Sequence, residues 1–282
     1  MWAAVCCLRT FSGRCCEDKN QKDVTEMTLE ELIAVVRQAG EIVNSAKQID
    51  RHTHEKTSAA DLVTDYDLAV EQFLKEQLAA LMPEALFFGE EEKAIEGDPS
   101  KGWVFIVDPI DGTTNFVRGY HQSGISVSLI RDLEPQMAVV YDPAKDELFA
   151  AERGKGATLN GAPIHVSDKP LDQGLFIMGT AIYLREFVKP TMSLTEQLLE
   201  RSCDYRRFGA ATLDLCYIAC GRAEVFFEYS LAPWDYAAGA FIAQEAGAIA
   251  STLTGEPLPW IRRCSVWLAN PANQHVLGEL TV

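Results

Sequence analysis

The chain has 282 residues, of which 48% are hydrophobic and 23% are charged, so it can bury a large core in one compact unit or in two halves. No run of about 18 apolar residues occurs, which predicts a cytoplasmic protein without a membrane span. The formal net charge of -16 disfavours a nucleic-acid backbone or an anionic membrane as a partner.

The N-terminal segment carries no clear structural signal. Four of the eight cysteines lie in it: Cys6, Cys7, Cys15 and Cys16. Adjacent cysteines lack the two-residue gap of common zinc sites, and the apolar stretch at residues 3–8 is too short for a signal peptide. We therefore expect residues 1–26 to form a disordered tail. The other cysteines are expected to be reduced packing residues: Cys203, Cys216, Cys220 and Cys264.

Helix signals begin directly after this tail. Thr28 and Glu31 predict a capping box, and Met27 can pack onto Leu32. We hypothesise that translation starts at Met27, which N-terminal mass analysis of protein made from the native gene would refute by detecting earlier residues. Two helices are predicted by apolar residues at helical spacing: Leu29, Leu32, Ile33, Val36 and Val43 in the first, and Val70, Phe73, Leu74, Leu78 and Leu81 in the second.

The run from Trp103 to Phe116 is the most informative segment. Its first five residues, Trp103–Val107, are large and apolar, which is typical of a strand buried on both faces. We expect the strand to end at Asp108, because Pro109 disfavours helical geometry before it and cannot donate to a ladder. The carboxylate of Asp108 is therefore predicted to emerge at the edge of the sheet.

A turn with anion-binding character follows this strand. Gly112 permits a sharp bend and close backbone approach, and Thr113 and Thr114 are good helix-capping residues. The N–H groups at a helix start attract anions. With Asp108 and Asp111 beside it, such a turn predicts phosphate held through cations, and the negative net charge strengthens the need for cations. The alternative is an ordinary strand-end acid with a proline turn and a helix cap.

Two other segments place acids at the ends of elements. Gly89–Glu92 follows the apolar stretch Leu86–Phe88, which puts a carboxylate at a second strand end, although a solvated charge run has the same pattern. Pro233 fits the start of a helix, and Asp235 lies in its first turn. Plain compensation of the helix dipole would also explain Asp235. The small residues at 237–240 allow close backbone packing.

The remaining elements alternate between strand and helix patterns. Ile125–Leu129 predicts a half-buried strand, which Met137–Tyr141 follows as a further strand. Thr212–Cys220 and Trp234–Ala246 predict helices, the second of which stops at Gly247. This alternation predicts a layered α/β architecture without internal repeats.

Four separated segments together resemble the signatures of the inositol monophosphatase family, in the order that the family uses. They are Lys56–Asp67, Gly89–Glu91, Asp108–Asn115 and Trp234–Gly239, and the resemblance spans about residues 28–270. It implies an α/β (α+β) fold, a five-layer αβαβα sandwich of the inositol monophosphatase and fructose-1,6-bisphosphatase type. The metal site would lie between an N-terminal half, residues 27–145, which carries most metal ligands, and a C-terminal half, residues 146–282.

The resemblance implies two magnesium ions and a third, weaker one. The implied metal ligands are Glu90, Asp108, the backbone carbonyl of Ile110, Asp111 and Asp235, with Asp108 bridging both main ions. Magnesium favours such hard oxygen ligands and is usually completed by water and substrate phosphate. Two ions roughly 4 Å apart can stabilise the attacking and the leaving oxygens of a displacement. The implied attacking water is activated by Glu90 and by the hydroxyl of Thr113.

The implied substrate contacts lie on both sides of the phosphate. They are Asp111, Gly112, Thr113, Gly209, Ala211, Glu228 and Asp235. Glu228 ends the alternating stretch Ala223–Glu228, which predicts a strand, and in this family an acid at the matching place accepts hydrogen bonds from sugar hydroxyls. A lone glutamate at a strand end is otherwise a solvated residue.

Two residues are implied to lie behind the metal ligands, Lys56 and Asp67. Asp67 fits a helix N-terminal acid equally well, since it follows Thr64 by three positions. The segment Leu171–Pro190 has no clear counterpart in the family pattern, so Tyr183 and Arg185 either line the pocket or lie on the surface.

The function implied is magnesium-dependent hydrolysis of a small-molecule phosphate monoester, from inositol 1-phosphate to myo-inositol and phosphate. Fructose 1,6-bisphosphate, NADP and a nucleotide 3′-phosphate (PAP) are alternative substrates within the superfamily. A haloacid-dehalogenase phosphatase is disfavoured because its acids lie two positions apart, whereas Asp108 and Asp111 are three apart. A regulator that binds metal without catalysis is the alternative from another class. The family also implies a homodimer and sensitivity to lithium.

Overall fold

The computed structural model describes residues 27–282 except 48, 59–60, 93–94, 96 and 182, and its description of side chains also omits residues 50, 51, 55–58 and 61. The expected tail, residues 1–26, lies outside the described residues. None of the described helices is long and apolar enough to span a membrane.

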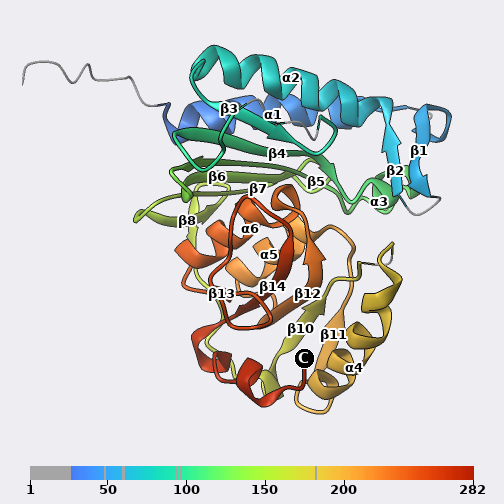
Figure 1. The fold of residues 1–282 in the computed structure, drawn as a ribbon, viewed down its shortest axis with the longest axis vertical. Coiled ribbons are helices and arrows are strands. Elements are labelled where there is room, and N and C mark those ends of the chain that lie inside the picture. Colours follow the sequence, from blue (N-terminus) through green and yellow to red (C-terminus); the bar gives the residue numbers. More distant parts are fainter. Residues whose placement is uncertain (1–26, 48, 59–60, 93–94, 96, 182) are drawn as a thin grey trace, which may run out of the picture.

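Two antiparallel helices form the outer layer of the N-terminal part (Figure 1). Helix α1, Leu29–Asn44, begins with the predicted capping box of Thr28 and Glu31. Met27 is 4% exposed and belongs to the same core as Leu32, as expected. Helix α2, Asp65–Leu81, packs beside α1 and on the first long strand of the sheet below. Both helices therefore cover one face of the larger sheet.

The larger sheet has seven strands in sequence order. They are β3 (Leu86–Gly89), β4 (Trp103–Asp111), β5 (Gly124–Arg131), β6 (Glu134–Asp142), β7 (Glu147–Glu152), β8 (Gly156–Leu159) and β9 (Ala162–Ile164). Only β3 and β4 are parallel, and the other neighbours are antiparallel. The prediction that β5 is half-buried was wrong: seven of its residues are buried, because α6 covers the face opposite α1.

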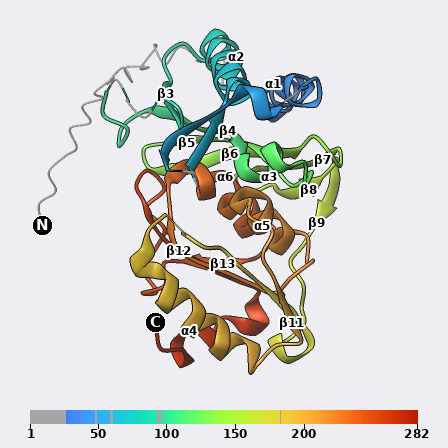
Figure 2. The ribbon, with the colours of Figure 1, turned by 90° about the vertical axis from the view of Figure 1, so that its right-hand side faces the viewer.

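A middle layer of two helices separates this sheet from a smaller one (Figures 1 and 2). These helices are α5 (Ala211–Ala219) and α6 (Pro233–Glu245), which pack on each other and on both sheets. The smaller sheet runs in the order β11 (Asp204–Arg206), β10 (Leu175–Met178), β12 (Val225–Leu231), β14 (Cys264–Ala269) and β13 (Ile249–Ser251).

The outer face of the smaller sheet is covered by α4, Val188–Leu199, through the buried side chains of Leu194 and Leu198. The order of layers is thus helix, sheet, helix, sheet, helix, which confirms the five-layer αβαβα prediction (Figure 2). Short elements complete the fold: the hairpin β1 (Thr53–Ser58) and β2 (Asp61–Thr64), helix α3 (Thr113–Arg118), and 3-10 helices η1 (Ile49–His52), η2 (Leu171–Gln173), η3 (Arg185–Phe187), η4 (Pro271–Asn273) and η5 (Val276–Glu279).

The larger sheet extends beyond the expected division of the chain. A boundary near residue 145 falls between two paired strands, β6 and β7, whereas one after Ile164 keeps each sheet intact. The division into two halves stays a prediction. Of the four cysteines expected to pack in the core, Cys216 is buried, Cys220 and Cys264 are partly buried, and Cys203 is exposed; all four are free thiols.

Candidate active site

Strand β4 delivers two acids to one pocket. The ladder with β5 pairs Asp108 with Ser126, is interrupted at Pro109 and Ile110, and resumes where Asp111 faces Gly124. The prediction that the strand ends at Asp108 was therefore wrong. Proline has no N–H for the ladder, and a bulge absorbs it instead of a chain end. Within the bulge, the N–H of Ile110 donates to Asp108 Oδ1 at 3.1 Å, which fixes the buried carboxylate.

The turn after β4 begins a short helix, but its cap differs from the prediction. The capping position of α3 is Gly112, at φ 83°, so Thr113 is the first helical residue. A Cβ on Gly112 would lie 3.0 Å from both Ala210 Cβ and the carbonyl oxygen of Gln122, which explains the glycine. The hydroxyl of Thr113 instead lies 3.1 Å from the carbonyl of Ile110 and 3.2 Å from Asp67 Oδ1.

Asp67 is the N-terminal acid of α2, as its sequence position suggested, and it also contacts Thr113. It is fully buried, and its Oδ2 accepts from the backbone N–H of Thr64 at 2.7 Å and from the Thr64 hydroxyl at 2.5 Å, which closes the capping box of α2. Its Oδ1 meets Thr113. The buried carboxylate of Asp67 therefore lies behind the Thr113 hydroxyl at the pocket. Lys56 lies on β1, and its side chain is outside the described residues.

Glu90 and Asp235 reach the same pocket from different layers. Strand β3 ends at Gly89, and the N–H of Glu90 donates to the carbonyl of Val107 at 3.1 Å, so Glu90 lies beside the end of β4. Asp235 is in the first turn of α6, as predicted, and its Oδ2 accepts from the N–H of Ala232 at 2.7 Å. The middle layer thus contributes its own acid to the acids of the larger sheet.

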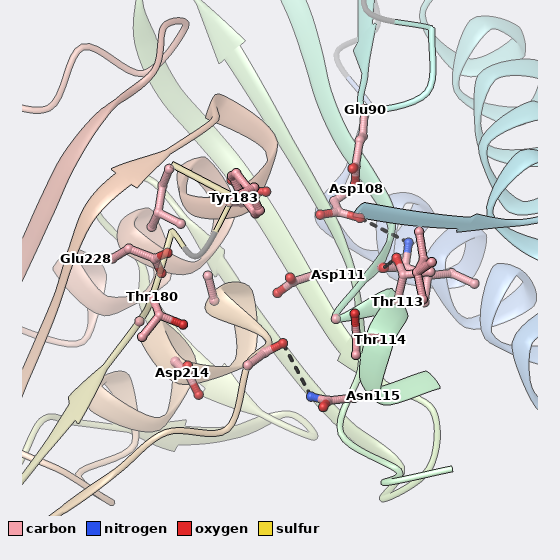
Figure 3. A pocket seen from close by; sticks show the side chains of 18 of the residues that line it. Glu90, Asp108, Asp111, Thr113, Thr114, Asn115, Thr180, Tyr183, Asp214 and Glu228 are labelled. Carbon is pink, nitrogen blue, oxygen red and sulfur yellow. Dashed lines mark hydrogen bonds between the residues drawn. The ribbon is translucent and has the colours of Figure 1, made fainter. Parts of the chain in front are cut away.

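The smaller sheet and the segment after β10 supply the opposite wall, on which Figure 3 shows Glu228, Thr180 and Tyr183. The prediction that the strand ends at Glu228 was wrong, because β12 continues past an irregularity to Leu231. Glu228 is only 6% exposed, so it is not a solvated strand-end residue. Gly179 lies against it, because a Cβ there would meet Glu228 Oε2 at 1.7 Å.

One pocket brings together the residues that the sequence proposed as metal and substrate contacts. They are Glu90, Asp108, Ile110, Asp111, Gly112, Thr113, Gly209, Ala211, Glu228 and Asp235. The other lining residues are Leu62, Thr114, Asn115, Gly179, Thr180, Tyr183, Arg207, Asp214 and Leu231. Of the two residues left open, Tyr183 lines the pocket, whereas Arg185 is an exposed residue of η3 outside the lining.

The residues that the sequence reasoning missed come mainly from the segments around β10 and α5. Thr180 follows β10, a parallel neighbour of β12, and a position just past a parallel strand is a usual place for a ligand contact. Asp214 is a lone acid within an apolar helix, which is a second usable signal. Arg207 donates to the Thr180 hydroxyl at 3.0 Å, but nothing in its sequence context indicates the pocket.

The electrostatics of the pocket favour a bound cation. Burial raises the pKa values of Asp108 and Asp235 above the usual range of an aspartate. The charges of Glu90 and Asp111 raise them further. Burial also raises the pKa of Asp111 to about 6, although two hydrogen bonds from Thr212 oppose the shift. Carboxylates that repel one another in a buried site are stabilised by divalent cations, and hard oxygen donors suit magnesium.

The donor set fits magnesium in kind, with carboxylates and the carbonyl of Ile110 around one cavity. Within the described part of the chain, no three Asp, Glu, His or Cys side chains stand close enough together to hold an ion as they are.

Comparison with known proteins decides the family. The model of the inositol monophosphatase family matches residues 24–281. This chain belongs to that family. The resemblance read from the four sequence segments is confirmed, and it extends over nearly the entire chain.

The relatives carry two kinds of name. This chain is 36% identical over 237 residues to a putative Nus factor SuhB of Neisseria meningitidis, covering 83% of this chain and 90% of that protein. It is 38% identical over 234 residues to inositol monophosphatase 1 of Solanum lycopersicum, covering 79% and 84%.

Solved structures of family members have the same fold. The extragenic suppressor protein suhB of Bartonella henselae matches with a TM-score of 0.82 and 29% identity, covering 89% of this chain and 96% of that one. The inositol monophosphate-bound inositol monophosphatase II of Staphylococcus aureus matches with a TM-score of 0.75 and 28% identity, covering 89% and 91%.

Proposed function

We propose that this member of the inositol monophosphatase family is a magnesium-dependent phosphate monoester hydrolase, and that inositol 1-phosphate is its substrate. One observation carries the proposal: acids from β4, α6 and the end of β3 line one pocket together with a threonine hydroxyl that rests on a buried aspartate. The relatives named inositol monophosphatase and those named SuhB are similarly identical to this chain, so the names do not choose the substrate.

Four acids and one carbonyl would hold the metal. They are Glu90, Asp108, Asp111 and Asp235, with the carbonyl of Ile110. The resemblance implies two or three ions. When bound, magnesium supplies charge stabilisation for the phosphoryl oxygens and lowers the pKa of water.

Thr113 and Glu90 would orient and deprotonate the attacking water. Because Asp67 Oδ1 lies 3.2 Å from the Thr113 hydroxyl, it can accept that proton in a hydrogen bond, which leaves the Thr113 oxygen to accept from the water. Glu90 lies at the same end of the pocket, as Figure 3 shows, and its carboxylate is the base. The N–H groups around Gly112 and Thr113 would receive the phosphate.

Glu228 and its neighbours would receive the alcohol part of the substrate. Burial, followed by the charges of Asp235 and Asp214, raises the pKa of Glu228 well above its usual range. A buried carboxyl group at a pocket wall favours a ligand rich in hydroxyls, which can donate to it. The backbone of Gly209 and Ala211 and the Thr180 hydroxyl extend this polar wall. A polyol monophosphate fits these contacts better than an apolar ester does.

The proposal is tested by phosphate release from a panel of inositol, fructose, glycerol and nucleotide phosphates and NADP, with and without magnesium. We expect magnesium-dependent turnover that is most efficient with inositol 1-phosphate. The variant Asp108→Asn should lose turnover by more than a hundredfold and keep the circular dichroism spectrum of the unmodified protein, because it removes the charge that two cations share. Unchanged turnover in Asp108→Asn would contradict the assignment, and a preference for another panel member would reassign the substrate.

Three further expectations stay predictions: the homodimer, the cytoplasmic location and the inhibition by lithium. So does the absence of nucleic-acid and membrane partners, which rests on the net charge of -16.

A further inference from the structure

A buried glutamate outside the proposed ligand set holds the segment that carries Glu90. Glu71 is on α2 and is 5% exposed. Its Oε2 accepts the backbone N–H of Glu91, and its Oε1 that of Glu92, each at 2.9 Å. The same carboxylate lies against Gly89, where a Cβ would come within 2.3 Å of Oε2. Glu71 therefore contacts the chain on both sides of Glu90.

This placement is energetically unfavourable for a carboxylate unless its hydrogen bonds are kept. Burial raises the pKa of Glu71, and the charges of Glu91 and Glu90 raise it further, while the two backbone N–H groups act in the opposite direction. A buried acid next to like charges costs stability, and an apolar residue would fill the space without that cost. Unlike an apolar residue, the carboxylate holds two consecutive N–H groups in fixed positions.

The same helix face also holds Thr113. Asp67 lies four residues before Glu71, so the two side chains stand one above the other on one face of α2. Asp67 Oδ1 meets the hydroxyl of Thr113, and Glu71 meets the segment after β3. One rigid helical turn, about 5.4 Å in pitch, thus sets the distance between the two groups proposed to activate water. Figure 3 shows the two groups, Glu90 and Thr113, on one side of the pocket.

We propose that Glu71 is a positioning residue of the active site, which aims Glu90 at the metal ion and keeps it in register with Thr113. The inference rests on the proposed function, because it concerns the ion that Glu90 would hold. It predicts that changes at Glu71 act on magnesium affinity more than on substrate affinity. Groups that orient a metal ligand from behind typically contribute tenfold to a hundredfold in metal affinity or activity.

Two substitutions separate position from charge. Glu71→Gln keeps one acceptor but sets its NH2 group against a backbone N–H, and Glu71→Asp keeps the charge but shortens the reach by one methylene. We expect both to raise the dissociation constant for Mg2+, measured by calorimetry on the protein without substrate, by about tenfold or more. The magnesium concentration for half-maximal phosphate release should rise in parallel, KM for substrate at saturating magnesium should change less than threefold, and excess magnesium should restore most of kcat.

Two control variants change side chains in or beside the same segment that do not hold its backbone. Glu92→Gln removes a charge two positions from Glu90 but keeps the N–H bond to Glu71. Lys75→Met removes the exposed ion pair between α2 and Glu92. Both should leave the magnesium dissociation constant within about twofold, since exposed pairs contribute little. Thermal unfolding shows whether each variant is folded, and Glu71→Asp, with its retained charge, is the variant expected to fold best.

The outcomes distinguish this inference from the proposed function. If the unmodified protein binds no magnesium and releases no phosphate, the proposed function fails and the inference fails with it. If the unmodified protein is active while either folded Glu71 variant binds magnesium within twofold of it, the proposed function stands and Glu71 has no positioning role. A tenfold loss in Glu71→Gln with an unchanged Glu71→Asp assigns the effect to charge and also overturns the inference.

Discussion

Asp111 accepts two hydrogen bonds from Thr212, one from its backbone N–H and one from its hydroxyl, each 2.7 Å long. Asp111 ends β4 of the larger sheet, and Thr212 lies in the first turn of α5, in the middle layer. The two residues are 101 positions apart in the chain. A proposed metal ligand is therefore oriented by the packing of the middle helices against the larger sheet.

We expect Thr212→Val to reduce kcat/KM for phosphate release about tenfold, because the isosteric side chain keeps the backbone bond to Asp111 and loses the hydroxyl bond. A hydrogen bond to a charged group contributes about 1.5 to 3 kcal/mol, so the free energy of unfolding should also fall by this order. Denaturant unfolding and steady-state kinetics check both. The matched control is Thr195→Val, which removes a buried hydroxyl bonded to Thr191 in α4 and should cost stability without changing kcat/KM.

Substitution of Glu228 tests the pocket wall that would contact the alcohol part of the substrate. Glu228→Gln should raise KM for inositol 1-phosphate by about tenfold and KM for p-nitrophenyl phosphate by less than twofold, because only the polyol has hydroxyls that donate to this group. The measurement is the ratio of the two KM values in each protein. Equal shifts for both substrates would remove Glu228 from the substrate contacts.

Gly179 offers an independent test of the same wall. In Gly179→Ala the new methyl group would meet Glu228 Oε2 at 1.7 Å, so the carboxylate has to move. We expect KM for inositol 1-phosphate to rise at least as much as in Glu228→Gln, together with a loss of about 1 to 3 kcal/mol in the free energy of unfolding from overpacking. Gly278→Ala, at a position with nothing within 4 Å and no positive φ, is the control for the loss of a glycine, and it should leave KM unchanged.

Removal of divalent ions should destabilise the protein in a pH-dependent way. The pKa of Asp111 is raised from 3.8 to about 6 by burial, and burial raises those of Asp108 and Asp235 as well. A carboxyl group whose folded pKa is raised contributes stability below its unfolded pKa and loses it as the pH rises through the folded value. With a chelator present, Tm should therefore fall between about pH 4 and pH 7.

Magnesium should reverse this loss, because it replaces protons as the partner of the acids. The increase in Tm on addition of magnesium should be larger at pH 8 than at pH 5, where protons compete with the ion. Differential scanning calorimetry at both values checks the direction. An increase that is the same at pH 5 and pH 8 would show that the acids do not titrate as a metal site.

The sequence predicted well which acids line the pocket, because each lies next to a local signal that is clear in the sequence. The apolar run before Asp108, the strand before Glu90 and the proline before Asp235 are local signals, and all three positions line the pocket. Gly112 was recognised as a bend, although it caps α3 itself and leaves the Thr113 hydroxyl to Asp67 and Ile110.

The misses come from contacts between elements that are distant in the chain. β5 was expected to have a polar face, but Ser126 and Ser128 turn toward the middle layer, where the Ser126 hydroxyl donates to the carbonyl of Trp234. Thr180 and Arg207 meet only because β10 and the segment before α5 lie side by side. Such long-range packing leaves no periodic pattern in the residues themselves.

The bulge in β4 determines which face of the sheet its two acids point to. In a regular strand, residues three positions apart point to opposite faces of the sheet, because side chains alternate. Asp108 and Asp111 nevertheless line one pocket, since Pro109 and Ile110 fall where the ladder is interrupted. The two acids are on the same side only because their spacing is odd and the strand is irregular between them. Without this irregularity the two acids would point to opposite faces of the sheet, and only one of them would reach the pocket.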